Sequence, residues 1–267
     1  SSLSLPRARP RAEARRSAKA VAAYLLRARC ARAALRVSDP RPYQIAVLAT
    51  LLGVGVLALD FDVRLANVAA IFAAALVAQA LVARRRGGRF AARSLLISAL
   101  SLCLLLRTSE PAIAAAVAAA SVGSKGLLRW RGKHVFNPTA FGLALALVAT
   151  DAAWVSPGQW GQTAWLGFAM ASAGIAVVHR AARSDVTWAF LASYAGLLLA
   201  RAAWLGDPLA VPPHALQIGA LVIFAFFMIS DPRTTPDARA GRIAFGFVVG
   251  AGALFVQYGL YRTNGLV

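Results

Sequence analysis

Long runs of apolar residues recur along the whole chain and are separated by short polar segments. Every face of these runs is apolar, so they lack the alternation that is typical of a membrane β-strand. The pattern predicts membrane helices over residues 43–59, 65–83, 95–106, 112–128, 141–150, 165–178, 186–200, 215–229 and 243–261. The third and fifth are short, because a full crossing needs about 20 residues. The predicted fold class is therefore an all-α polytopic membrane protein with about nine transmembrane helices.

The composition agrees with this pattern and excludes several classes of protein. Hydrophobic residues make up 59% of the 267 positions and charged residues 15%, whereas about a quarter of a soluble domain is charged. A soluble enzyme, a secreted disulfide scaffold and a disordered tail protein are excluded. The net charge of +19 would indicate nucleic-acid binding in a soluble protein. Here the charge lies between apolar runs, so we expect the lipid bilayer as a partner and no nucleic acid.

The basic residues alternate from one gap to the next. Residues 1–42, 84–94, 123–134, 180–185 and 231–242 hold 11, 5, 4, 2 and 3 Lys or Arg residues, respectively. The other gaps hold one each, namely Arg64, Arg107, Arg201 and Arg262. By the positive-inside rule, the N-terminus is expected in the cytoplasm and residue 262 outside.

Residues 1–42 form a basic tail that is too long to be a cleavable signal peptide. Ser17 could cap a helix that carries Val21, Leu25 and Leu35 on one side and arginines around them. Such a helix would lie on anionic lipid headgroups. The alternative is a poorly ordered tail that only sets the orientation of the chain.

The sequence offers little metal chemistry. Cys30 and Cys103 are far apart, and the three histidines show no ligand spacing. We therefore expect no metal site. Gly246 and Gly250 are separated by one helical turn, a spacing that predicts close helix packing rather than chemistry.

Two proline-centred motifs are the most informative segments. Residues 132–142 read Gly-Lys-His-Val-Phe-Asn-Pro-Thr-Ala-Phe-Gly, and residues 226–236 read Phe-Phe-Met-Ile-Ser-Asp-Pro-Arg-Thr-Thr-Pro. Proline starts or breaks helices, and Asn137 and Asp231 precede the prolines. We expect these two side chains to satisfy backbone groups freed by the break or to coordinate a ligand there. Broken helices at membrane depth occur only inside protein or beside a cavity.

The motifs lie in corresponding places, after the fourth and the eighth predicted helix. This placement suggests an inverted repeat, the arrangement that builds central sites in transporters, although two such dipeptides could also coincide by chance. The predicted organisation is a basic tail (1–42), a first membrane repeat (43–150), an outer loop (151–164) and a second membrane repeat (165–267).

Together with Gly-Arg-Ile-Ala-Phe-Gly at 241–246, the two motifs resemble the NqrB/RnfD family over roughly residues 43–267. These proteins are membrane subunits of the sodium-pumping NADH:quinone oxidoreductase (Nqr) and of the Rnf electron-transport complex. The resemblance implies two inverted five-helix repeats, similar to urea transporters, in a bacterial-type inner membrane. It also implies other membrane-complex subunits as partners. The family pattern continues through one more helix, so the second repeat is expected to lack its last helix at Val267.

The chain departs from the family in its outer loop. Family members carry covalent flavin mononucleotide (FMN) on the threonine of a Ser-Gly-Ala-Thr motif. Residues 151–163 of this chain contain Ser156 and Thr163 but no such motif. We therefore expect no covalent FMN, and FMN or riboflavin, if bound, to be held non-covalently; quinone is the other candidate ligand. The loop's aromatic residues either stack on a flavin ring or mark the membrane interface; they are Trp154, Trp160 and Trp165.

The candidate ligand-binding residues lie in and beside the motifs. A basic cluster of Lys125, Arg129, Arg131, Lys133 and His134 is interpreted either as a clamp for an anionic ligand or as an orientation signal. No catalytic residue is assigned. The predicted cofactor-binding residues are Lys133, His134, Asn137, Thr139, Asp231, Thr234 and Thr235.

Three functions remain open at this stage. The first is a membrane subunit of an Rnf/Nqr-like electron-transport complex, in which cofactors do the electron chemistry. The second is a channel or transporter for a small solute on the same scaffold. The third is a non-catalytic membrane anchor of a larger complex.

Overall fold

The computed structural model describes residues 39–155, 164–208, 210–216 and 218–260. The basic tail with Ser17 and Cys30 lies outside this part of the chain, as do Ser156, Trp160, Thr163 and the side chain of Trp165. The first half contains helices α2 (Arg41–Ala58), α3 (Leu65–Arg86), α4 (Ala92–Leu105), α5 (Pro111–Leu127) and α6 (Pro138–Ala149). The second half contains α7 (Ala164–Arg180), α8 (Ser184–Leu205), α9 (Val211–Leu216), α10 (Gly219–Ile223), the π-helix η1 (Phe224–Met228), α11 (Arg239–Leu254) and the π-helix η2 (Phe255–Gly259).

The prediction of an all-α polytopic membrane protein is confirmed. Helices form at all nine apolar segments, and four of them are long and apolar enough to cross a membrane by themselves: Arg41–Ala58, Leu65–Arg86, Ser184–Leu205 and Arg239–Gly259. The eighth predicted segment is not one helix but the series α9, α10 and η1. Large apolar side chains cover the outside, among them Leu57, Val148 and Trp204, each at least 87% exposed. Such a surface suits lipid rather than water.

The two short helices are continued by paired strands. With 12 residues, α6 is about 18 Å long, too short for a hydrocarbon core of about 30 Å. Strand β1 (Leu106–Thr108) follows α4 and strand β4 (Ala153–Val155) follows α6, and the two pair antiparallel, with Arg107 opposite Trp154. Each extended segment satisfies the backbone groups of the other, as non-helical backbone at membrane depth requires.

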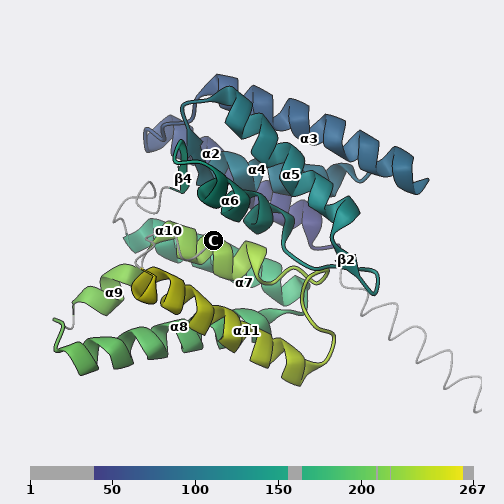
Figure 1. Cartoon of the computed structure of the whole chain (residues 1–267). Coiled ribbons are helices and arrows are strands. Elements are labelled where there is room, and N and C mark those ends of the chain that lie inside the picture. The colour runs from purple at the N-terminus through teal and green to yellow at the C-terminus, as the bar shows by residue number, and fades with distance from the viewer. Residues whose placement is uncertain (1–38, 156–163, 209, 217, 261–267) are drawn as a thin grey trace, which may run out of the picture. The chain divides into compact units, whose positions relative to one another are not determined.

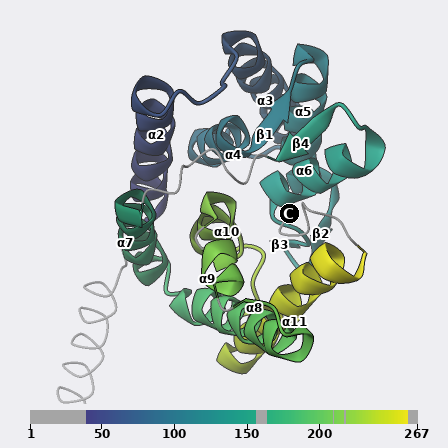
Figure 2. The same ribbon diagram turned by 90° about the vertical axis from the view of Figure 1, so that its left-hand side faces the viewer.

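Within each half of the chain, the helices pack against one another in pairs. Figures 1 and 2 show α2 to α6 on one side and α7 to α11 on the other. In the first half α3 packs along α5 and α2 along α4, and in the second α8 packs along α11 and α7 against α10 and η1. The predicted role of Gly246 and Gly250 in close helix packing is confirmed, because a Cβ atom on either would lie 2.7 Å from α8, at Val186 O or Ser193 Oγ.

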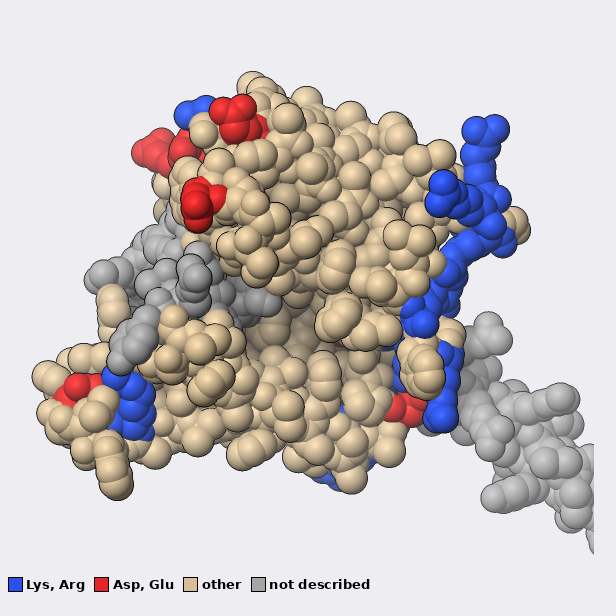
Figure 3. Space-filling view, viewed as in Figure 1, with Lys and Arg blue, Asp and Glu red and all other residues tan. Residues whose placement is uncertain are grey.

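The two ends of the molecule differ in charge. Lys and Arg side chains gather at the end that holds the hairpin of β2 (Arg129–Trp130) and β3 (Lys133–His134), as Figure 3 shows. We call this end the basic face. Most acidic side chains visible in that view lie at the opposite end. The alternation of basic residues along the sequence therefore corresponds to two faces of the folded chain.

Candidate functional site

Hydrogen bonds join the two proline motifs to each other at the basic face. His134 N donates a hydrogen bond to Arg233 O at 3.0 Å, and Lys133 Nζ donates one to Thr235 O at 2.8 Å. The side chain of Asn137 reaches Met228 O at 3.0 Å. Segments that are far apart in the sequence therefore form one site between the two halves of the chain.

Asn137 has two structural roles at once. Its Oδ1 accepts hydrogen bonds from Thr139 N (3.0 Å) and Ala140 N (3.2 Å), so the residue is the N-cap of α6. Pro138 occupies the first helical position, where its missing N–H is no loss. The Nδ2 group of the same side chain bonds Met228 O in the other half. The prediction that Asn137 satisfies backbone groups at a helix break is confirmed.

Asp231 organises the second motif in a similar way. Its Oδ1 accepts from Arg233 N at 2.9 Å, and its carbonyl oxygen accepts from the N–H groups of Thr234 (3.0 Å) and Thr235 (3.1 Å). The prediction that Asp231 satisfies local backbone groups is confirmed as well. Burial raises the pKa of this carboxyl above its ordinary value, against the hydrogen bond from Arg233 N and the charges of Arg233, Arg41 and Lys125, which lower it.

The break in the eighth segment leaves carbonyl groups of η1 without a partner in the helix, and side chains from elsewhere in the chain donate hydrogen bonds to them. Gln44 Nε2 on α2 donates to Phe227 O at 3.0 Å, and Thr187 Oγ1 on α8 donates to Ala225 O at 2.8 Å. Ser230 Oγ donates to Phe226 O. With the bond from Asn137, these contacts hold the end of η1 in place between the two halves.

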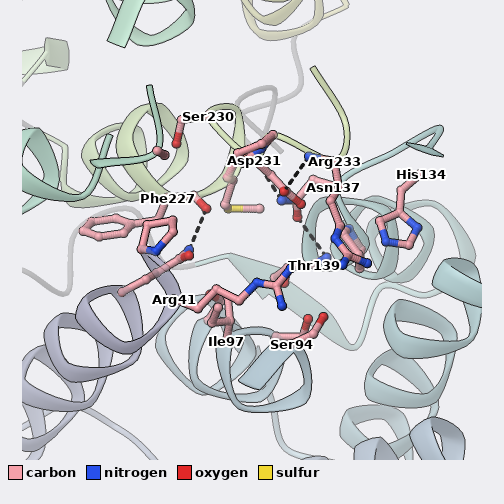
Figure 4. A pocket seen from close by; sticks show the side chains of 18 of the residues that line it. Arg41, Ser94, Ile97, His134, Asn137, Thr139, Phe227, Ser230, Asp231 and Arg233 are labelled. Carbon is pink, nitrogen blue, oxygen red and sulfur yellow. Dashed lines mark hydrogen bonds between the residues drawn. The ribbon is translucent and has the colours of Figure 1, made fainter. Parts of the chain in front are cut away.

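A cavity of about 180 Å³ lies where these elements meet. Figure 4 shows Arg41 and Ser94 on one side of it and Asp231 with Arg233 on the opposite side. Lys125, at the end of α5, also lines it, and its Nζ donates to Ser94 O (2.9 Å) and Ser94 Oγ (3.0 Å). We call this space the inner cavity.

A wider and more open groove of about 550 Å³ lies beside the inner cavity. The hairpin contributes Trp130, which is 71% exposed, and the residue after the second motif, Asp237, also lines the groove. Lys133 forms an ion pair with Asp237 at 2.5 Å, and this hydrogen bond is the main cause that lowers the pKa of the Asp237 carboxyl. We call this space the outer groove.

The predicted ligand-binding residues fall into these two spaces, and their role in binding stays a prediction. His134 lines both spaces. Asn137, Thr139 and Asp231 line the inner cavity, whereas Lys133, Thr234 and Thr235 line the outer groove. The predicted basic cluster is divided, because Lys125 enters the inner cavity while Arg129 and Arg131 are exposed on the hairpin.

Sequence reasoning missed the contribution of α2 and α4 to the site. Arg41 and Gln44 come from the start of α2, and Ser94 comes from the start of α4. In the sequence Arg41 counts only as part of a basic tail, and an isolated Gln or Ser in an apolar run carries no distinguishing signal. Only the packing of these helix ends against the motifs reveals them.

His134 is expected to make the stability of the folded chain depend on pH. Burial, followed by the charges of Arg129 and Arg233, lowers its pKa to about 4, compared with about 6.5 in an unfolded chain. As the pH falls from about 6.5 to about 4, the unfolded chain takes up a proton here that the folded chain refuses, so stability is lost within this window. The measurement is the thermal unfolding midpoint against pH, compared with His134→Gln. Equal slopes for the two proteins would contradict the prediction.

A family of known proteins matches the part of the chain that contains the second motif. Residues 151–264 match the NQR2, RnfD, RnfE family. This match agrees with the family resemblance over that segment. The match includes residues 226–236 but not residues 132–142, so it is narrower than the resemblance seen by inspection.

Individual relatives match a shorter part of the chain than the family does. The chain is 36% identical over 95 residues to the D subunit of the ion-translocating oxidoreductase complex of Escherichia coli O1:K1 / APEC, covering 34% of this chain and 25% of that protein. It is 35% identical over the same length and with the same coverage to the proteins of the same name from strains HS (O9:H4) and K12 / DH10B. The matched segment thus spans about a quarter of the length of these relatives.

Proposed function

We propose that this chain is a multi-pass inner-membrane subunit of an Rnf/Nqr-type redox complex, and that it holds a flavin or a quinone non-covalently in the outer groove. The observation that carries the proposal is the junction of the two proline motifs, which places four of the seven predicted residues around a groove of suitable size. The family match over residues 151–264 supports the same class of complex. Other subunits of that complex are the proposed partners, and the basic face is proposed to lie in the cytoplasm with the N-terminus.

The two spaces differ in what they can hold. Sites for molecules of this size enclose about 300–1,000 Å³, so the inner cavity of about 180 Å³ is too small for a flavin ring system. The outer groove, at about 550 Å³, is large enough. Residues that fit a flavin are therefore those of the groove rather than Asn137, whose side chain is engaged at both ends.

The groove residues suit a planar, polar-edged ring. The exposed indole of Trp130 offers a face for stacking, and Lys133 offers a cation to the oxygen atoms at a ring edge. Its ion pair with Asp237 is a surface pair, which contributes little to stability, so Lys133 can exchange this partner for a ligand. A bound flavin would supply one- and two-electron chemistry, while these residues supply position and charge.

The arrangement of helices also supports the proposed inverted repeat. The first helix of each half packs against the third, and the second packs against the fourth: α2 with α4 and α3 with α5, then α7 with α10 and η1 and α8 with α11. Two halves with the same internal packing are what an inverted repeat requires. The proposed site lies where these halves meet.

The test is the flavin content of the complex purified from its native membrane. We expect flavin absorbance that is released into the supernatant on acid precipitation, and a loss of at least half of it in Trp130→Ala and in Lys133→Gln. The thermal unfolding midpoint should stay unchanged in Trp130→Ala and fall in Lys133→Gln, because the second variant also loses the hydrogen bond to Thr235 O. The control is Trp204→Ala, which removes another exposed tryptophan at the far end of α8. Absence of flavin and quinone from the intact complex would favour an anchor, and flavin retained on the denatured band would contradict non-covalent binding.

A further inference from the structure

The inner cavity carries an excess of positive charge. Among the described residues that line it, three are cationic (Arg41, Lys125 and Arg233) and two are carboxylates (Asp39 and Asp231). Asp39 is already paired with Arg41 Nε at 3.8 Å through its Oδ1, and with Arg93 Nη1, from outside the lining, at 2.8 Å through its Oδ2. Even with both carboxylates ionised, positive charge therefore exceeds negative charge, which repels a metal cation and attracts an anion.

Lys125 has a donor left for a ligand. Its side chain is buried, with 7% of the residue exposed, and its two hydrogen bonds go to neutral oxygen atoms of Ser94. An ammonium group carries three donors, so one remains unused within the part of the chain that the structure describes. A buried cation without a carboxylate in direct contact is costly unless an anion accompanies it.

His134 points to the same conclusion independently. The residue is 8% exposed, and its Nδ1 has no hydrogen-bond partner among the described residues. A buried polar atom that is left unpaired costs about 1–3 kcal/mol, so such an atom beside a cavity indicates a bound partner. The imidazole lines the inner cavity as well as the outer groove.

The size of the inner cavity limits what this partner can be. A volume of about 180 Å³ corresponds to about six water molecules at about 30 Å³ each. The first N–H groups of α6 are bonded to Asn137, so recognition falls to side chains. Lysine and arginine side chains are typical ligands of phosphate and carboxylate oxygens.

We infer that the inner cavity binds a small oxyanion of the phosphate type, held by Lys125 and Arg233 with His134 beside it. The oxyanion is either free phosphate or the terminal phosphate of an FMN whose ring lies in the outer groove. The second source rests on the proposed function, whereas the first does not. The inner cavity is thus an anion site rather than part of a pathway for metal cations.

The experiment is a titration of the purified full chain with inorganic phosphate, by calorimetry in a neutral detergent and without flavin. We expect saturable binding that weakens at least tenfold in Arg233→Gln and in Lys125→Gln. Arg233 is exposed outside the helices, so its replacement leaves the fold intact even if that of buried Lys125 does not. The matched control is Arg131→Gln, an exposed arginine that lines only the outer groove, for which we expect a change of less than twofold.

Competition separates the two sources of the oxyanion. Displacement of labelled phosphate by FMN but not by riboflavin would assign the site to the flavin phosphate, and displacement by neither would assign it to a free anion. Absence of saturable phosphate binding, or equal weakening by Arg131→Gln and Arg233→Gln, would overturn the inference. Because these titrations contain no redox partner, their failure is distinguishable from failure of the flavin proposal.

Discussion

Replacing Gly246 with Ala is expected to lower the free energy of unfolding by about 1–3 kcal/mol, the usual effect of forcing extra atoms into a packed contact. A Cβ atom at this position would lie 2.7 Å from Val186 O and 3.0 Å from Phe190 N, both backbone atoms of α8. Backbone atoms of a helix cannot move aside separately, so α8 and α11 must separate. The measurement is thermal unfolding in detergent, followed by tryptophan fluorescence.

A glycine on the same helix provides the control. Gly252 also lies on α11, and a Cβ atom there would meet nothing within 4 Å. Gly252→Ala is therefore expected to leave stability unchanged or to raise it by up to about 1 kcal/mol through helix propensity. If the two substitutions destabilised the protein equally, the loss would come from the change of residue type, and the close approach of α8 at Gly246 would not be its cause.

Replacing Asn137 with Ala is expected to lower the free energy of unfolding by about 2 kcal/mol. About half of this is the loss of the N-cap of α6, and the rest is the loss of the hydrogen bond to Met228 O. Because that bond joins the two motifs, the same substitution should also open the inner cavity and the outer groove. Unfolding midpoints and the accessibility of the basic face to protease measure the two effects.

Two further variants separate these roles. Asn137→Asp keeps an oxygen that can cap Thr139 N, but its second carboxylate oxygen would face the acceptor Met228 O, so it should show all of the loss of protection and more than half of the loss of stability. Asn137→Ser caps the helix with a side chain too short for Met228 O and brings no second oxygen, so it should show about half of the loss of stability and all of the loss of protection. Normal stability and normal protection in Asn137→Ala would show that the hydrogen bond from Asn137 to Met228 O contributes nothing.

Much of the candidate site could be predicted, because its chemistry follows the chain locally. The residue before a proline is restricted in its backbone and often caps the segment after it, so Asn137 and Asp231 were correctly assigned to helix breaks. The basic cluster was predicted less well. Lys125 and Arg131 are near neighbours in sequence, yet Lys125 lines the inner cavity and Arg131 is exposed in the turn of the hairpin. The pair of strands that separates them has no clear signal in the sequence.

Hydrophobic segments and the alternation of basic residues were sufficient to determine that this is an all-α polytopic membrane protein and which ends of its helices share a face. They were sufficient because apolar length and the charge of loops depend on each residue's affinity for lipid or water, whatever its neighbours are. The tertiary structure decided everything that depends on two distant segments in contact: the pairing of β1 with β4, the division of the eighth segment into α9, α10 and η1, and the bonds between the two motifs. It also brought Arg41 and Ser94 to the inner cavity, because the packing of helix ends depends on shape across the whole fold.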